Sequence, residues 1–158
     1  MMSPPALERE ALLPRIDGIG RNLKKMEQLA ALPFDQFSDG DPFDLAQHHL
    51  RLALEGIFHI SSHILSRIPG GRAVEYKEIA LKMGDLKLIP ADFSKQVLVR
   101  MAGMRNILVH HYADIDARKL YDTIKNHRDD IQTFLKHIKA ILQDPQKYGL
   151  TLNGGGRV

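Results

Sequence analysis

Apolar residues recur every three or four positions along most of this chain, and this spacing constrains its fold more than any other feature. One such stripe consists of Leu12, Ile16, Ile19, Leu23 and Met26, with mostly polar or small residues between them. That spacing places side chains on one face of an α-helix. No stretch shows the sustained two-residue alternation that is typical of a half-buried strand. The sequence therefore predicts an all-α protein without a sheet.

Proline, glycine and capping residues divide the apolar stripes into about five helices. We expect the first regular helix to begin near Pro14, because proline is tolerated only near a helix start. A second is expected from Asp41 and Pro42 to a stop at Pro69. These two long helices, joined by a short loop, predict an antiparallel hairpin. Three further helices are expected over residues 75–83, 90–110 and 116–142, the last capped by Asp116.

Length and composition predict one globular domain. The chain has 158 residues, with 44% hydrophobic and 26% charged residues, which is the balance of an ordinary soluble protein. We assign residues 1–145 to a single domain and residues 146–158, which include three consecutive glycines, to a flexible tail. No apolar run approaches the ~20 residues that span a bilayer, and the first ten residues do not resemble a signal peptide. We therefore expect a cytoplasmic protein that does not contact a membrane.

The residue types available limit the chemistry. The chain has no cysteine, which leaves histidine, arginine, carboxylates and tyrosine as reactive groups. Its 22 Lys and Arg against 19 Asp and Glu give a net charge of +3, which mildly favours an anionic partner such as RNA.

The stretch from Arg105 to Tyr112 gathers a guanidinium, an amide, imidazoles and a phenol near one helix end. Histidine can act as a general acid or base near neutral pH, and arginine can bind a phosphate through two hydrogen bonds in a bidentate contact. However, Arg105 and His110 are about 140° apart on a straight helix. They converge only if the helix is distorted or a second copy completes the site. A structural alternative gives these residues no chemical role. In it, Arg105 caps the carboxyl end of a neighbouring helix, His110 and His111 lie in the last turn, where the helix dipole favours cations, and Tyr112 packs against other side chains.

This stretch resembles the signature of the HepT branch of the HEPN superfamily: an arginine, four residues, a histidine, one residue and a tyrosine. Arg105, His110 and Tyr112 fill these positions, and Asn106 follows the arginine as in that family. The resemblance covers residues 12–142 and implies a HEPN-type helical bundle built on a long antiparallel hairpin. Upstream, it includes Leu50, Glu55, Ile60, His63 and Ile64.

The resemblance also implies an activity. HEPN proteins of this branch pair as homodimers, and the motif forms a metal-independent endoribonuclease site at the dimer interface, without a cofactor. Transferred to this chain, Arg105 binds the scissile phosphate, His110 acts as general acid or base, and Asn106 orients one of them. His111 lies beside His110 and is a second candidate for its role. The expected product carries a 2′,3′-cyclic phosphate.

The same resemblance implies a partner. Such chains are toxins of type VII-like toxin–antitoxin systems, neutralised when an MntA-type nucleotidyltransferase transfers AMP to the motif tyrosine, here Tyr112. The alternative is a non-catalytic binding or scaffold subunit of a minimal nucleotidyltransferase. Two positions depart from the family's pattern. Arg51 stands where the family often has Gln, and His59 stands where it often has an acidic residue.

Other polar groups have simpler explanations. Glu55, His59 and His63 are spaced by four and could offer a metal three ligands on one helix face. We consider this a minor alternative, because the family needs no metal. The basic runs over residues 21–25 and 118–128 are expected to be exposed helix faces rather than binding surfaces.

Overall fold

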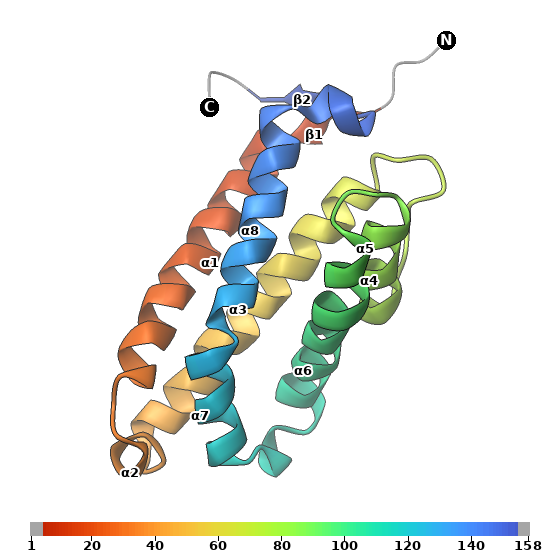
Figure 1. Cartoon of the computed structure of the whole chain (residues 1–158). Coiled ribbons are helices and arrows are strands. Elements are labelled where there is room, and N and C mark those ends of the chain that lie inside the picture. The colour runs from red at the N-terminus through yellow and green to blue at the C-terminus, as the bar shows by residue number, and fades with distance from the viewer. Residues whose placement is uncertain (1–4, 155–158) are drawn as a thin grey trace.

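Two long antiparallel helices, α1 (Arg9–Ala30) and α3 (Asp41–Leu65), form the frame of the protein (Figure 1). The computed structural model describes residues 5–154, and the short helix α2 (Phe34–Phe37) connects the two long ones. The apolar stripe of α1 is buried where the helix packs against α3. The predicted hairpin is therefore confirmed, as is the start of its second helix at Asp41 and Pro42.

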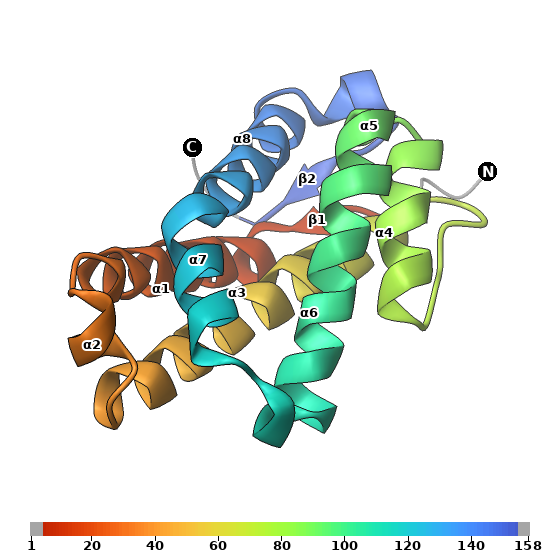
Figure 2. The same ribbon diagram turned by 60° about the horizontal axis from the view of Figure 1, so that its bottom comes forward.

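A second pair of helical segments packs on the other side of α3 (Figure 2). α4 (Tyr76–Asp85) is followed by α5 (Ala91–Phe93), a π-helical turn η1 (Ser94–Leu98) and α6 (Val99–His110), which together form the expected helix from Pro90 to His110. α4 and the π-helical turn η1 approach closely at Gly84, where an added Cβ would lie 2.4 Å from the Cβ of Ser94. Ser94 is buried and its hydroxyl donates to the Ala80 carbonyl, 2.6 Å away.

The expected last helix is divided in two. α7 (Ala117–Asn126) and α8 (Arg128–Gln143) meet at His127, whose φ of −114° and ψ of 6° lie outside the helical range. The predicted cap is confirmed, because the Asp116 carboxylate accepts a hydrogen bond from the Arg118 amide at 3.0 Å. Both helices contact α1, so the core is enclosed by α1, α3, α6 and the α7–α8 pair.

The prediction that the first regular helix begins near Pro14 is wrong. α1 begins at Arg9 and contains Pro14. A proline inside a helix costs about 3 kcal/mol through a missing hydrogen bond and a clash with the preceding turn. Leu7 and Leu12, which flank this turn, are fully buried, and each such burial stabilises by about 1.5–3 kcal/mol. Their burial offsets the cost of the proline.

The predicted flexible tail from Gln146 and the predicted absence of a sheet are also corrected. Residues Pro145–Tyr148 form a 3₁₀ turn (η3), Leu150 is buried, and β2 (Leu152–Asn153) pairs in parallel with β1 (Leu7–Glu8). The Leu7 amide donates to the Thr151 carbonyl at 2.7 Å. Leu150 supplies the burial that fixes this segment, and a two-residue pairing is too short to show periodicity. The remaining tail residues, 155–158, lie outside the described residues.

Substitutions of two helical glycines test this packing. Gly84→Ala should lower the free energy of unfolding by about 1–3 kcal/mol, because its methyl group overlaps Ser94. Gly20→Ala is the matched control, since an added Cβ there meets nothing within 4 Å. It should raise the free energy of unfolding by about 0.5–1 kcal/mol through helix propensity. Urea unfolding measures both, and a Gly84→Ala chain as stable as the Gly20→Ala chain contradicts the close approach.

Candidate active site

The motif lies at one end of the bundle, opposite the paired strands (Figure 1). α6 is regular helix from Val99 to His110, and His111 ends it with a φ of −134° and a ψ of 34°. A 3₁₀ turn (η2, Tyr112–Asp114) follows. His110 and His111 are exposed, and Tyr112 has 68% of its surface exposed. The structural alternative in which Tyr112 packs into the core is therefore wrong.

Arg105 is held much more firmly than its neighbours. Its guanidinium carbon lies 4.4 Å from the centroid of the Tyr76 ring, and Nη2 is 3.8 Å from a carboxylate oxygen of Glu55. Only 21% of the side chain is exposed. The Tyr76 ring in turn stacks on Phe58 at 4.7 Å. A cation over an aromatic face is stabilised electrostatically, so α3 and α4 together hold Arg105 in place, and it does not cap a helix.

The guanidinium of Arg105 is only weakly hydrogen-bonded within the described residues. Nε is buried and has no hydrogen-bond partner within residues 5–154, and Nη1 makes only a long bond of 3.5 Å to the Asn106 amide oxygen. Glu55 is shared, because Arg51 also approaches it at 3.3 Å. One carboxylate between two guanidinium groups leaves a net positive charge. The arrangement favours an anion with several acceptor oxygens.

A hollow of about 430 Å³ lies beside this charged group, between α3 and the end of α6. We call it the motif hollow. Arg51 and Glu55 line one side and Tyr112 the other; Gln47, His48, Leu108 and Val109 complete its lining. The hollow thus joins the exposed phenol of Tyr112 to the carboxylate that holds Arg105.

The structure does not bring Arg105 and His110 together within one chain. No side-chain hydrogen bond joins them, and the His110 imidazole forms no hydrogen bond or ion pair with any described residue. Because α6 stays helical through His110, no distortion between them removes their separation of about 140°. His111 is differently placed, since its Nδ1 lies 4.0 Å from the Asp114 carboxylate.

The metal-binding alternative for Glu55, His59 and His63 is not supported. Nε2 of His63 accepts a hydrogen bond from the Glu8 backbone amide at 3.0 Å, and His59 Nδ1 is 2.6 Å from Arg15. No group of three ligands with metal-site geometry occurs within residues 5–154. Burial lowers the pKa of both histidines, with further lowering from Arg67 at His63 and from Arg15 at His59. Neutral imidazoles can accept these hydrogen bonds, so both histidines have structural partners.

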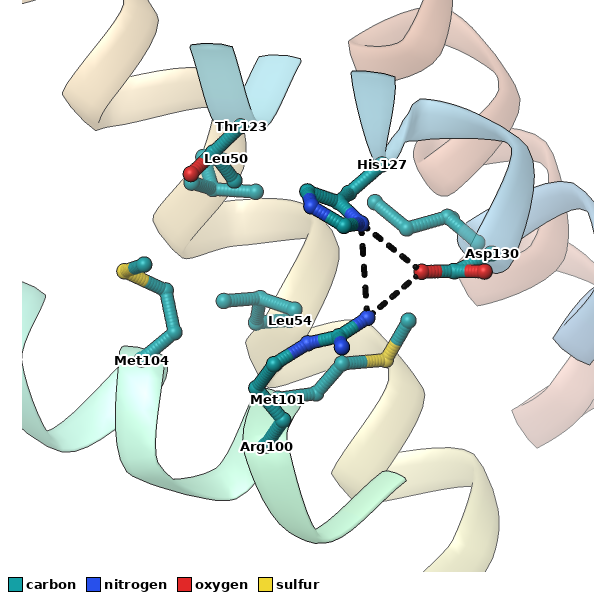
Figure 3. A pocket seen from close by; sticks show the side chains of 9 residues that line it. Leu50, Leu54, Arg100, Met101, Met104, Thr123, His127 and Asp130 are labelled. Carbon is teal, nitrogen blue, oxygen red and sulfur yellow. Dashed lines mark hydrogen bonds and ion pairs between the residues drawn. The ribbon is translucent and has the colours of Figure 1, made fainter. Parts of the chain in front are cut away.

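A separate apolar pocket of about 130 Å³ lies between α3, α6 and the α7–α8 pair (Figure 3). Met101 and Met104 of α6 face Leu50 and Leu54 of α3 across it. At its rim, Arg100 binds the Asp130 carboxylate at 2.8 Å, close to His127. None of the motif's polar residues lines it, and its ion pair instead connects α6 to α8. This connection helps to fix the helix that carries the motif.

Sequence reasoning named Arg105, Asn106, His110, His111 and Tyr112, but it missed Tyr76. This tyrosine occupies the first position of α4, about thirty residues before the arginine it contacts. Nothing in the local pattern of residues 75–83 distinguishes an aromatic ring that supports a cation from one that fills the core.

Comparisons with known proteins identify the family. The model of the family described as "Ribonuclease HepT-like" matches residues 19–138. The chain belongs to the HepT-like ribonuclease family. Curated HepT relatives include a tRNA nuclease of Aphanizomenon flos-aquae, 25% identical over 129 residues, which cover 81% of this chain and 87% of the relative. Another is an mRNA nuclease of Shewanella oneidensis, 24% identical over 138 residues, with 83% and 98% covered.

A solved structure shows the same all-α HEPN fold. It is the tri-AMPylated Shewanella oneidensis HEPN toxin in complex with an MNT antitoxin, and the match has a TM-score of 0.74 at 25% identity. It covers 84% of this chain and 98% of the matched one. The expected HepT resemblance and HEPN-type bundle are thereby confirmed. Within residues 5–154, no helix is both long and apolar enough to cross a membrane.

Proposed function

We propose that this chain is the toxin of a toxin–antitoxin pair and that it cleaves RNA without a metal ion. The observation that carries the proposal is the arrangement at the end of α6. A partly exposed guanidinium is held in place with only long contacts at its Nη groups, and an exposed imidazole without a side-chain partner lies on the same helix. The family match supports it, as do the two relatives named as RNA nucleases.

The proposed reaction uses the groups that the motif supplies. Arg105 binds the scissile phosphate and offsets the charge that develops in the transition state. His110 takes the proton of the 2′-hydroxyl or protonates the leaving 5′-oxygen. The 2′-oxygen then forms a bond to phosphorus as the bond to the 5′-oxygen breaks, which leaves a 2′,3′-cyclic phosphate and a 5′-hydroxyl. Asn106 orients one of these two residues, and its contact of 3.5 Å with the Arg105 guanidinium favours Arg105.

The proposal requires a second copy of the chain. Arg105 and His110 diverge on one regular helix, so a two-fold pairing is the remaining way to bring an arginine and a histidine to one phosphate. Large apolar side chains are exposed on α3 and α6, the helices beside the motif hollow: Leu45 at 47% and Ile107 at 42%. A homodimer that covers these helices would bury them.

For regulation, we propose that a nucleotidyltransferase antitoxin transfers AMP from ATP to the Tyr112 hydroxyl, with release of pyrophosphate. The phenol is exposed and lies at the rim of the motif hollow. A phosphodiester attached there adds negative charge close to Arg51 and Arg105 and competes with RNA for them. The structure of the AMPylated HEPN toxin with its antitoxin supports this proposal.

The catalytic assignment is tested by cleavage of total RNA in excess EDTA. The unaltered chain and His111→Ala should both cleave, because the proposal assigns the proton transfer to His110. His110→Ala should be slower by at least about 100-fold, which is the usual contribution of a general acid or base. Cleavage that persists in His110→Ala and disappears in His111→Ala would overturn the assignment. A complete lack of cleavage by chain free of AMP would favour a non-catalytic subunit of a nucleotidyltransferase.

The modification is tested by mass spectrometry after incubation with the cognate nucleotidyltransferase and ATP. The unaltered chain should gain the mass of one or more AMP groups, and Tyr112→Phe should gain none. Tyr148→Phe is the matched control, because Tyr148 lies in η3, in the opposite part of the fold, and it should be modified like the unaltered chain. An unchanged mass gain in Tyr112→Phe contradicts the proposed acceptor.

A further inference from the structure

A groove of about 580 Å³ runs between α1 and α3, and positively charged side chains line it. Arg15, Arg21 and Lys25 line it from α1, and His49 and His59 from α3. We call it the basic groove. Part of the sequence run 21–25 that we expected to be only an exposed helix face thus lies on a concave surface, together with residues from a second helix.

Two glycines belong to the lining of this groove. At Gly56 an added Cβ would lie 3.0 Å from Ile19 of the facing helix, so α1 and α3 approach closely there. At Gly18 the only atom within 4 Å of an added Cβ is the Arg21 guanidinium, at 3.7 Å. The side chains that lie over these two glycines are therefore those of Ile19 and Arg21, and the Arg21 guanidinium is placed where an extended anionic ligand can contact it.

The positive charge of the groove is not balanced by carboxylates. The side chains of Arg21 and Lys25 form no ion pair or hydrogen bond within residues 5–154, and Arg15 contacts His59 rather than an acid. Glu55 is the one carboxylate in the lining, and Arg51 and Arg105 already engage it. A concave surface with unpaired cations concentrates anions.

The two imidazoles add hydrogen-bond donors to these charges. His49 Nδ1 lies 3.1 Å from the Asn22 side-chain oxygen, and its pKa is lowered by burial, by His48 and by Lys25. Burial and Arg15 likewise lower the pKa of His59. Bound phosphate groups would offset the repulsion from these cations, so the imidazoles can donate to phosphate oxygens and gain protons on binding.

The basic groove is continuous with the motif hollow. Glu55 lines both of them and also contacts Arg105 at 3.8 Å, so the groove adjoins the site where the scissile phosphate is proposed to bind. The lining of the groove contains no phenylalanine, tyrosine or tryptophan on which bases could stack. The lining of the groove therefore suits binding to the phosphodiester backbone of a strand, without recognition of its bases.

We propose that the basic groove binds the phosphodiester backbone of the RNA strand next to the scissile phosphate. The inference rests on the proposed ribonuclease function and adds a sequence-independent binding surface to it. It explains why α1, which contributes nothing to the motif, carries unpaired cations beside the site.

RNA binding by the His110→Ala chain, which leaves the substrate intact, tests the inference. Fluorescence anisotropy with a labelled single-stranded RNA of about 15 nucleotides gives the Kd as a function of salt. Adding Arg21→Ala and Lys25→Ala should weaken binding by about tenfold or more and reduce the slope of log K against log salt by about 1.4, which corresponds to two lost contacts. The matched control is Lys136→Ala with Lys139→Ala, two exposed lysines of α8, and it should change neither quantity.

A second variant separates charge from stability. Gly18→Glu places a carboxylate beside Arg21 on the floor of the groove, while the helix interior favours glutamate over glycine. It should weaken RNA binding by at least about fivefold, with a melting temperature equal to or above that of the parent.

The possible results distinguish the two proposals. If the Arg21 and Lys25 substitutions leave the Kd and the salt slope equal to those of the α8 control, the groove inference is wrong, even if the unaltered chain cleaves RNA. If they weaken RNA binding but the unaltered chain does not cleave, the groove binds an RNA backbone, while the ribonuclease proposal and its scissile phosphate fail. If they weaken binding of the antitoxin and not of RNA, the groove is a protein interface and the inference is overturned.

Discussion

The close packing of α1 against α3 is the contact on which the rest of the structure depends. At Gly56 an added Cβ would lie 3.0 Å from the Ile19 side chain, so the two helices approach closely there. The buried stripes of the two helices fix their register and direct the polar face of α3, with Arg51 and Glu55, toward the end of α6. The same packing forms the floor of the basic groove. One helix contact therefore positions both charged surfaces that we connect with RNA.

Electrostatics explains why these surfaces suit an anion. Glu55 is shared by Arg51 and Arg105, so neither guanidinium is fully neutralised. The Tyr76 ring contacts the face of the Arg105 guanidinium. This cation–π contact does not use the hydrogen-bond donors of Arg105. A phosphate that reaches Arg105 therefore finds a group already in position and does not have to break a strong ion pair. An AMP group on Tyr112 would enter the same charged region.

The sequence predicted the parts of this protein that periodicity and local motifs determine. The stripe from Leu12 to Met26, the helix start at Asp41 and Pro42, and the Asp116 cap all follow local rules, and the structure confirms them. The motif residues were found through their spacing and the family resemblance. The roles of Arg105 and His110 in cleavage stay predictions.

What the sequence did not predict depends on contacts between distant residues. The burial of Leu7, Leu12 and Leu150 keeps Pro14 inside a helix and fixes the residues after Pro145. The break at His127 has no proline or glycine to mark it. The contact of Tyr76 with Arg105 and the meeting of Arg15, Arg21 and Lys25 with the histidines of α3 arise only when the helices pack.

The most direct test of a site shared between two copies is the activity of a mixed dimer. One chain carries Arg105→Ala and the other His110→Ala, each with a different affinity tag, so that the mixed species is purified after co-expression. If each site takes its arginine from one chain and its histidine from the other, a mixed dimer keeps one of two sites and should cleave RNA at about half the unaltered rate. Activity no higher than that of the two single-variant dimers would contradict the shared site.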